Sequence, residues 1–526
     1  MRVHLGRLLA GGFAVIVSTS PAAVATVQRA TERAPVVYTM RFPAPETNLA
    51  HVDARVPTDG RASIDLMLPV WSPGFYGRGD YARNVQDFTA TTPSGEVLAV
   101  SKPKPNHWII TTNGASTVLL SYKLLCRSTF VTGSWVGPDF AVINGPSTFI
   151  TLDEQASRPH EVRLILPPAW KQSITSLDEV SGGSHAYRGA DYDVFIDSPI
   201  VAGSISVHTF EVGGSRHSLA DFGDLGVWDG AAAAATLKTI VEEHRRFLGE
   251  LPFKKYVFLN AFRGGQGGLE HQNSSLLSSA RAPKDPLPTL RWLNYVSHEY
   301  FHAINVKRLR PIELGPFDYE QLPRTPSLWI SEGVTTYYGD LAVVRSGVGR
   351  PEDFLAGFSN RIRALQTSPG RLVQTLEQAS LGVGVSSSSG VGGNRGQTVS
   401  YYEKGCIVGL LLDARIRRLT NGAKSFDDVM RLAIRRYSGA RGFRPEEFVA
   451  TASEVAGADL TDFLRKAVAT TEELDYSEAL DWFGLRFAAP GSEDAAAAWR
   501  IEIRPDATDA QKRRFASWMA ASNGGR

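Results

Sequence analysis

Two histidines and a glutamate stand in a pattern that can hold a metal ion and move a proton. Residues 298–302 read His-Glu-Tyr-Phe-His, so on a helix His298 and His302 share one face and can reach the same zinc ion. Glu299 lies beside them, where a carboxylate can take a proton from a water molecule on the ion and later pass it to a leaving amine. The alternative, a packed helix with two chance histidines, is weakened because both would lie among apolar residues without compensation. The pattern therefore predicts hydrolysis at a zinc centre.

A catalytic zinc site needs a third protein ligand, and the chain offers four acidic candidates downstream. Glu313, Asp318 and Glu320 lie in a segment broken by proline and glycine. Glu332 lies in the apolar segment LWISEGVTTYY, which is predicted to form a helix beside the first one. An ionised carboxylate there is costly unless it is paired or bound to a metal. Glu332 is therefore the predicted ligand, and Glu320 is the alternative.

The composition excludes several classes of protein. The chain has 526 residues, 43% of them hydrophobic and 21% charged, and a formal net charge of +2. This balance is typical of a globular protein with more than one domain, and it lacks the basic excess of a nucleic-acid binder. The only cysteines, Cys126 and Cys406, rule out a disulfide framework or a cysteine-based zinc cluster. They could pair in an exported protein, although a buried free thiol is expected at Cys406.

The first 25 residues are typical of a secretory signal peptide. Basic residues precede the apolar run LLAGGFAVIV, and small residues follow, ending in Ala-Val-Ala at 23–25. The run is too short to span a bilayer, and no later stretch is long and apolar enough to do so. The prediction is an exported protein, periplasmic or secreted, without a membrane span once the signal is removed. The alternative is an N-terminal helix that is buried or anchors the chain.

Hydrophobic periodicity predicts an α+β fold with several domains. Residues 36–210 alternate or run apolar over short stretches bounded by turn residues, as strands do. After residue 227 the pattern is mainly helical, apart from the strand-like KYVFLNAF. The Gly/Ser-rich stretch 382–397 is either a mobile flap or a plain linker. The predicted divisions are the signal peptide 1–25, a β-sandwich-like domain 26–215, a helical domain with the histidine motif 216–475, and a strand-and-helix segment 476–526.

Several segments carry a family resemblance. The runs HEYFHAINVKRLRP and WISEGVTTYYGDL, with WSPGFYGRGDYARNV near the N-terminus, resemble the glycyl aminopeptidase family of zinc metallopeptidases, which belongs to the gluzincins. The segments GGLEH (267–271) and YEKG (402–405) are similar to motifs of the more distant aminopeptidase N family. The resemblance implies an N-terminal β domain and a thermolysin-like catalytic domain. It also implies a C-terminal PDZ domain, but the residues after Phe487 are too few, so this chain is predicted to lack one.

The resemblance also implies roles for residues outside the zinc motif. Tyr402 would stabilise the oxyanion through its hydroxyl, with the adjacent Tyr401 as the alternative. Gly267 and Gly268 would let an edge strand pair with an extended substrate, and Glu270 would face the free N-terminus of that substrate.

Three positions depart from the pattern of the resembled families, one of them Ile304, where an aromatic residue is common. His271 replaces an asparagine and is expected to be a hydrogen-bonded histidine of the core or rim, not a ligand. Thr336 stands where thermolysin-like enzymes carry an aspartate that orients a zinc ligand, so the partner of that histidine is open.

Taken together, the residues and the resemblance predict a zinc aminopeptidase that removes small N-terminal residues such as Gly or Ala from peptides. A zinc endopeptidase with the same core, or a non-enzymatic peptide-binding protein, are the alternatives. The carboxylate of Glu270 separates the first two, because only an aminopeptidase has to recognise a free α-ammonium. The expected partners are peptide substrates and Zn²⁺, with no nucleic acid, and the oligomeric state is not predicted.

Overall fold

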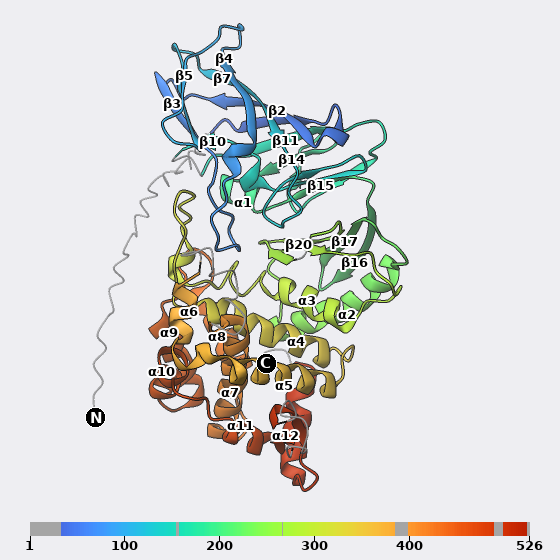
Figure 1. Cartoon of the computed structure of the whole chain (residues 1–526), viewed down its shortest axis with the longest axis vertical. Helices are drawn as coiled ribbons and strands as arrows, with labels where there is room; N and C mark the ends of the chain where they lie inside the picture. Colours follow the sequence, from blue (N-terminus) through green and yellow to red (C-terminus); the bar gives the residue numbers. More distant parts are fainter. Residues whose placement is uncertain (1–32, 154–156, 266, 384–397, 489–497, 523–526) are drawn as a thin grey trace, which may run out of the picture.

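The computed structural model describes residues 33–153, 157–265, 267–383, 398–488 and 498–522. A β-rich half lies above a helical half, with a small sheet between them (Figure 1). The predicted signal peptide 1–25 and most of the Gly/Ser-rich stretch 382–397 lie outside the described residues. Within the described part, no helix combines the length and apolar character needed to cross a membrane.

Three sheets and a short helix form the N-terminal half. In β2, alternate residues from Ala50 to Val56 are buried, the period of two expected for a strand with one face in a core. The seven-stranded sheet, in spatial order, contains β13 (Asp178–Glu179), β14 (Ala186–Gly189), β11 (His160–Ile165), β1 (Val36–Arg41), β2 (Leu49–Pro57), β7 (Thr117–Leu125) and β4 (Val85–Thr91). One four-stranded sheet contains, in spatial order, β10 (Thr151–Leu152), β3 (Ser63–Met67), β6 (His107–Thr111) and β5 (Val100–Ser101). The other contains β12 (Gln172–Ile174), β15 (Ile200–Gly203), β9 (Phe140–Ile143) and β8 (Trp135–Val136). The helix is α1 (Tyr192–Ile196), and the 3₁₀ turns are η1 (Pro45–Thr47), η2 (Tyr81–Asn84) and η3 (Gly145–Ser147).

A five-stranded sheet joins the two halves. Its order is β16 (Ser206–Val212), β17 (Ser215–Gly223), β18 (Lys255–Phe262), β20 (Ser274–Ser279) and β19 (Gly267–Glu270). On β18, Phe258 faces the helices α2 (Gly230–Leu248) and α3 (Leu290–Phe301), while Val257 and Leu259 face the N-terminal domain. The sheet is therefore buried on both faces. β16, which the sequence analysis placed in the N-terminal domain, pairs with β17 in this sheet.

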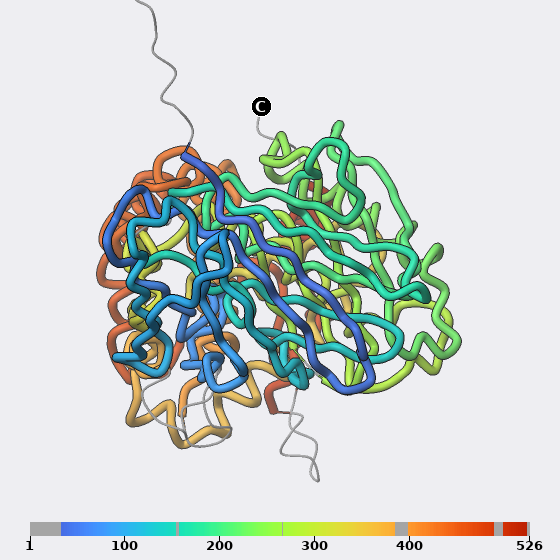
Figure 2. The backbone as a smooth tube through the Cα atoms, turned by 90° about the horizontal axis from the view of Figure 1, so that it is seen from above, coloured from blue at the N-terminus to red at the C-terminus, as the bar shows by residue number. Residues whose placement is uncertain are grey.

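The helical half is built around one buried helix. α7 (Tyr401–Leu419) contacts most of the other helices of this half, and most of its residues are buried. Seen from above, the strands of the N-terminal domain lie over these helices (Figure 2). The other elements are η4 (Ile312–Leu314), the π-helix η5 (Trp329–Val334), α4 (Thr335–Arg345), α5 (Pro351–Thr367), η6 (Pro369–Leu372), α6 (Leu376–Leu381), α8 (Phe426–Tyr437), α9 (Pro445–Ala456), α10 (Thr461–Ala469) and α11 (Ser477–Phe483).

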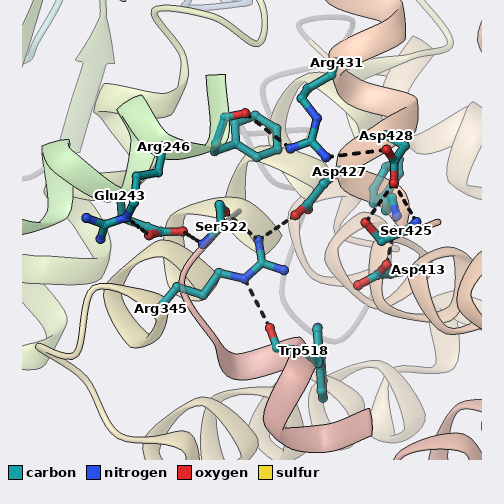
Figure 3. A network of polar contacts seen from close by, with 12 residues as sticks. Glu243, Arg246, Arg345, Asp413, Ser425, Asp427, Asp428, Arg431, Trp518 and Ser522 are labelled. Atoms are coloured by element: carbon teal, nitrogen blue, oxygen red, sulfur yellow. Dashed lines mark hydrogen bonds and ion pairs between the residues drawn. The ribbon is translucent and has the colours of Figure 1, made fainter. Parts of the chain in front are cut away.

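The C-terminal segment is fastened to the helical half by a buried polar network (Figure 3). It holds the hairpin of β21 (Leu485–Phe487) and β22 (Ile501–Ile503) and the helix α12 (Asp509–Met519). Arg345 on α4 donates to the carbonyl of Trp518 at 3.1 Å and to Asp427 on α8 at 2.9 Å, and the backbone N–H of Ser522 donates to Glu243 on α2 at 2.9 Å.

Both cysteines, Cys126 and Cys406, are buried free thiols, as expected for Cys406.

Candidate metal centre and active site

The helix α3 presents the two histidines of the motif. It begins after Thr289, whose side chain accepts a hydrogen bond from the N–H of Trp292, and its apolar face packs on the five-stranded sheet. His298 and His302 lie on the opposite side, with their Nε2 atoms 3.0 Å apart. Gly339 on α4 allows close packing here, since a Cβ at that position would lie 3.0 Å from the Cα of His298. The predicted helix and the shared face of the two histidines are both present.

Glu332 completes the cluster from the π-helix η5. Its Oε2 lies 3.2 Å from Nε2 of His302 and 3.6 Å from Nε2 of His298. One ligand atom from each of the three residues falls within 4.8 Å of the others. The element that carries Glu332 packs against α7 through two glycines, because a Cβ on Gly333 would lie 2.5 Å from the Cα of Gly405. π-helical turns are frequent at functional sites.

Hydrogen bonds at the far side of each ring orient the imidazoles. Nδ1 of His302 donates to the carbonyl of Asn305 at 3.0 Å, a group that can only accept. Thr336 lies with its hydroxyl oxygen 3.3 Å from Nδ1 of His298, and that hydroxyl donates to the carbonyl of Glu332 at 2.9 Å. The threonine oxygen therefore accepts from His298, so Thr336 is the partner that orients this ring. Both rings are left with Nε2 pointing into the cluster.

The cluster requires a positive charge at its centre. With both Nδ1 atoms protonated, two nitrogen lone pairs and the carboxylate of Glu332 converge, and nothing between them donates a proton. Burial lowers the pKa of His302, but the nearby carboxylates of Glu332 and Glu270 outweigh burial and raise the pKa to about 10, so the surroundings favour a positive charge at this position. Two imidazole nitrogens and a carboxylate oxygen are the donor set that zinc takes at catalytic sites, so the residues fit that ion.

Glu299 lies beside the cluster and outside the ligand set. Its carboxylate is buried, and burial, followed by the charges of Glu270 and Glu332, raises its pKa to about 8 even though His302 lowers it. A base works best when its pKa is near the working pH, and a bound cation would move this value down from about 8 toward it. The strand β19 passes directly over the carboxylate, because a Cβ on Gly268 would lie 2.0 Å from Oε1 of Glu299.

β19 forms the edge of the five-stranded sheet and carries Glu270. In the described part of the chain it pairs with β20 alone, so its other edge is unpaired. Gly267 has a φ of +134°, a backbone conformation that favours glycine. Glu270 is 3% exposed, and its carboxylate lies within the 4.8 Å cluster formed with Glu299 and His302. Burial raises the pKa of Glu270, and its Oε1 has no hydrogen-bond partner among the described residues.

Tyr402 and Tyr401 differ in their surroundings. They occupy the first turn of α7, which begins after Ser400, whose side chain caps the helix. Tyr402 is partly buried and stacks on His298, with ring centroids 6.0 Å apart, whereas Tyr401 is 1% exposed within the core of the helical half. Burial, together with the nearby charge of Glu332, raises the pKa of Tyr402 well above its ordinary value, so its hydroxyl stays protonated. Of the two tyrosines, Tyr402 is the one beside the predicted metal ligands.

Other residues weighed from the sequence lie elsewhere. Glu320, the alternative ligand, accepts hydrogen bonds from Lys104 and Asn106 of the N-terminal domain, and Glu313 accepts one from Thr325. His271 is buried with Nδ1 3.0 Å from Asp197, which agrees with a hydrogen-bonded core histidine.

Two contributions to the site were missed from the sequence. Asn305 anchors His302 and also donates from its side chain to the carbonyl of Ile330, which ties α3 to η5. A loop of the N-terminal domain brings Gly74 against Glu270 and places Tyr76 in the core of the helical half. The signal for that loop was present, since it lies within the segment WSPGFYGRGDYARNV that carried the resemblance.

Two family models match this chain, one in its N-terminal domain and one in its catalytic part. The Peptidase M61 N-terminal domain matches residues 37–204, and M61 glycyl aminopeptidase matches residues 291–408, so that together they cover more than half of the chain. No curated protein matches the sequence.

Solved structures share the fold over most of the chain. An aminopeptidase N family protein from Idiomarina loihiensis is 25% identical with a TM-score of 0.81, covering 86% of this chain and 78% of its own. An M1 zinc metallopeptidase from Deinococcus radiodurans is 14% identical with a TM-score of 0.54, covering 84% and 95%. Yeast LTA4 hydrolase in complex with bestatin is 14% identical with a TM-score of 0.52, covering 84% of this chain and 68% of its own. At 14% identity, these last two structures are evidence for a shared fold and for nothing more. The chain is a metallopeptidase that belongs to the M61 glycyl aminopeptidase family.

Proposed function

We propose that this aminopeptidase removes small N-terminal residues, Gly or Ala, from peptides, and that Glu270 recognises the free end. The observation that carries the proposal is the position of Glu270: a buried carboxylate with an unpartnered oxygen, clustered with Glu299 and His302 within 4.8 Å. A substrate whose α-ammonium pairs with Glu270 has its first peptide bond beside His298, His302 and Glu332. The description of the family, glycyl aminopeptidase, supports the preference for a small residue.

His298, His302 and Glu332 would hold the zinc ion. Zinc supplies Lewis-acid chemistry, polarising a carbonyl and making a water molecule acidic near neutral pH. The hydrogen bonds from Nδ1 of the two rings to Asn305 and Thr336 keep both Nε2 atoms directed at one point. Such outer contacts orient ligands and raise their basicity.

Glu299 would move the proton. The buried carboxylate takes a proton from the attacking water and gives it to the leaving amine as the peptide bond breaks. Because Gly268 brings the backbone of β19 against this carboxylate, a substrate lying along that strand has its bond within reach of Glu299. The unpaired edge of β19 supports binding of an extended peptide through backbone hydrogen bonds.

Tyr402 would stabilise the oxyanion. Its hydroxyl stays protonated, and its ring stacks on His298, so the phenol stands at the rim of the cluster. A donor that bonds best to the developing charge acts in the transition state.

The test compares free and N-acetylated peptides that differ in nothing else. The enzyme should cleave Gly- or Ala-terminated peptides far faster than their acetylated forms, because an acetylated end leaves Glu270 buried and unmatched. Glu270→Ala should remove most of that preference by slowing the free peptides, with zinc content unchanged. A pairing of Glu270 with Arg263 would be the structural alternative, but Arg263 donates instead to the carbonyl of Ser128, and no ion pair between the two is present among the described residues. Equal rates on free and acetylated peptides in the unmutated enzyme would point to an endopeptidase instead.

We also propose that the protein is exported. The signal-peptide pattern of residues 1–25 supports this, and those residues lie outside the described part of the structure. Sequencing the N-terminus of the mature protein from its native host should find a start near Thr26. An intact Met1 would contradict export through this signal.

A further inference from the structure

The loop between β3 and β4 leaves the N-terminal domain and enters the active site. Figure 1 shows this blue segment reaching down toward the helical half. It is hydrogen-bonded to the segment that follows α3, which itself reaches the core of the N-terminal domain: the N–H of Val70 donates to the carbonyl of Tyr319 at 2.9 Å, and the indole of Trp71 donates to the carbonyl of Asp318 at 2.7 Å. The loop therefore has a defined position over the site, although it comes from the other domain.

Glycine at position 74 lets this loop touch Glu270. A Cβ there would lie 2.6 Å from Oε1 of Glu270, and the φ of +95° also favours glycine. The backbone at Gly74 thus forms a wall of the space around the carboxylate.

Two residues later, Tyr76 turns into the helical half. It is 4% exposed and belongs to the same buried cluster as Trp329 and Tyr401, which are far from it in the sequence. Its hydroxyl is buried and has no hydrogen-bond partner among the described residues. Burial and the nearby charges of Glu332 and Glu270 raise the pKa of Tyr76 well above its ordinary value, which agrees with a hydroxyl close to both carboxylates. A buried hydroxyl without a partner is costly and calls for an explanation.

The unpartnered oxygens of Tyr76 and Glu270 call for the same kind of ligand. They do not hydrogen-bond to each other in this structure. An ammonium group has three N–H donors and no acceptor, so it can satisfy a carboxylate oxygen and a phenol oxygen at once. The free N-terminus of a peptide is such a group.

We propose that Tyr76 is a substrate-binding residue, whose hydroxyl oxygen accepts a hydrogen bond from the α-ammonium of the substrate while Glu270 balances the charge. The free end of the peptide is then recognised by both domains. This rests on the proposed aminopeptidase function and adds a residue of the N-terminal domain to it.

The test is Tyr76→Phe with Tyr81→Phe as the matched control. Tyr81 lies in the same segment and is also buried, but it packs in the core of the N-terminal domain. Loss of a hydrogen bond to a charged group should raise KM for a free Ala-terminated peptide about ten- to a hundredfold in Tyr76→Phe. The kcat, zinc content and Tm should stay near those of the unmutated enzyme, and Tyr81→Phe should leave KM unchanged.

A binding measurement without turnover gives a second readout. L-alaninol carries the ammonium but no scissile bond, so its inhibition constant should rise by the same factor as KM in Tyr76→Phe. A fall in kcat with KM unchanged would make Tyr76 an oxyanion donor and overturn the proposal. Unchanged kinetics, or an equal loss on free and acetylated peptides, would overturn it as well. If the unmutated enzyme does not prefer free peptides, the aminopeptidase function itself fails; if it does and Tyr76→Phe keeps that preference, only the role of Tyr76 fails.

Discussion

Replacing Glu299 by glutamine separates proton transfer from metal binding. The change keeps the size of the side chain and removes its charge, and the three predicted ligands His298, His302 and Glu332 stay in place. Proton transfer by a positioned side chain typically contributes about 10²–10⁴-fold, so kcat should fall by that factor, which corresponds to about 3–5 kcal/mol. Zinc content should stay at that of the unmutated protein.

The structure also sets the direction of the change in stability. Glu299 is a buried carboxylate close to those of Glu270 and Glu332, and their mutual repulsion contributes to the raised pKa. With a pKa of about 8 this carboxyl is largely protonated near pH 7, so the change replaces a mostly neutral group by a neutral glutamine of the same size, and the Tm should not fall. A fall in rate therefore cannot be assigned to unfolding.

The assay combines steady-state kinetics on a free Ala-terminated peptide, metal analysis and thermal unfolding on one preparation. His302→Ala is the matched control: two remaining protein ligands hold zinc poorly, so that variant should lose both metal and activity. Metal loss in Glu299→Gln, or a rate close to that of the unmutated enzyme, would refute the assignment of Glu299 as the base.

Two further predictions concern the oxyanion and acid stability. Tyr402→Phe should lower kcat about 10²–10³-fold with a smaller change in KM; if the loss appears in Tyr401→Phe instead, the neighbouring tyrosine is the donor. Acid should destabilise the protein through three buried histidines, because burial lowers their pKa to about 4 for His160 and His217 and about 3 for His244, against 6.5 when exposed. At these three positions the unfolded chain binds more protons, so the stability that they contribute is complete well above pH 6.5 and is lost as the pH falls toward 4. Urea unfolding measured from pH 7 to pH 4.5 checks this, and a flat profile would contradict it.

The zinc motif and its third ligand could be predicted from the sequence because helix spacing and the cost of burying a charge are properties of short segments. Spacing by four residues puts His298 and His302 on one face of any helix, and α3 is capped and amphipathic by itself. Glu332 stood out because an ionised carboxylate in an apolar segment needs a partner wherever the segment packs. The strands of the N-terminal domain followed from their alternating pattern in the same way.

The tertiary structure alone decided what surrounds these residues. Asn305 and Thr336 orient the two imidazoles. Nothing in the sequence around Asn305 indicates this role, and at Thr336 the sequence left open which group would orient the histidine. Whether Tyr401 or Tyr402 faces the predicted metal ligands depends on how α7 packs against η5, and the two elements meet closely at Gly333 and Gly405.

The contact of Gly74 with Glu270 shows the same limit over a longer range. The two residues belong to different halves of the molecule, and they come together because the loop around Gly74 fits against the catalytic half. Local sequence determines helices, strands and the cost of burying a charge. Which polar groups then meet in the interior is set by the packing of whole elements, since one contact between distant segments depends on all the others that place them.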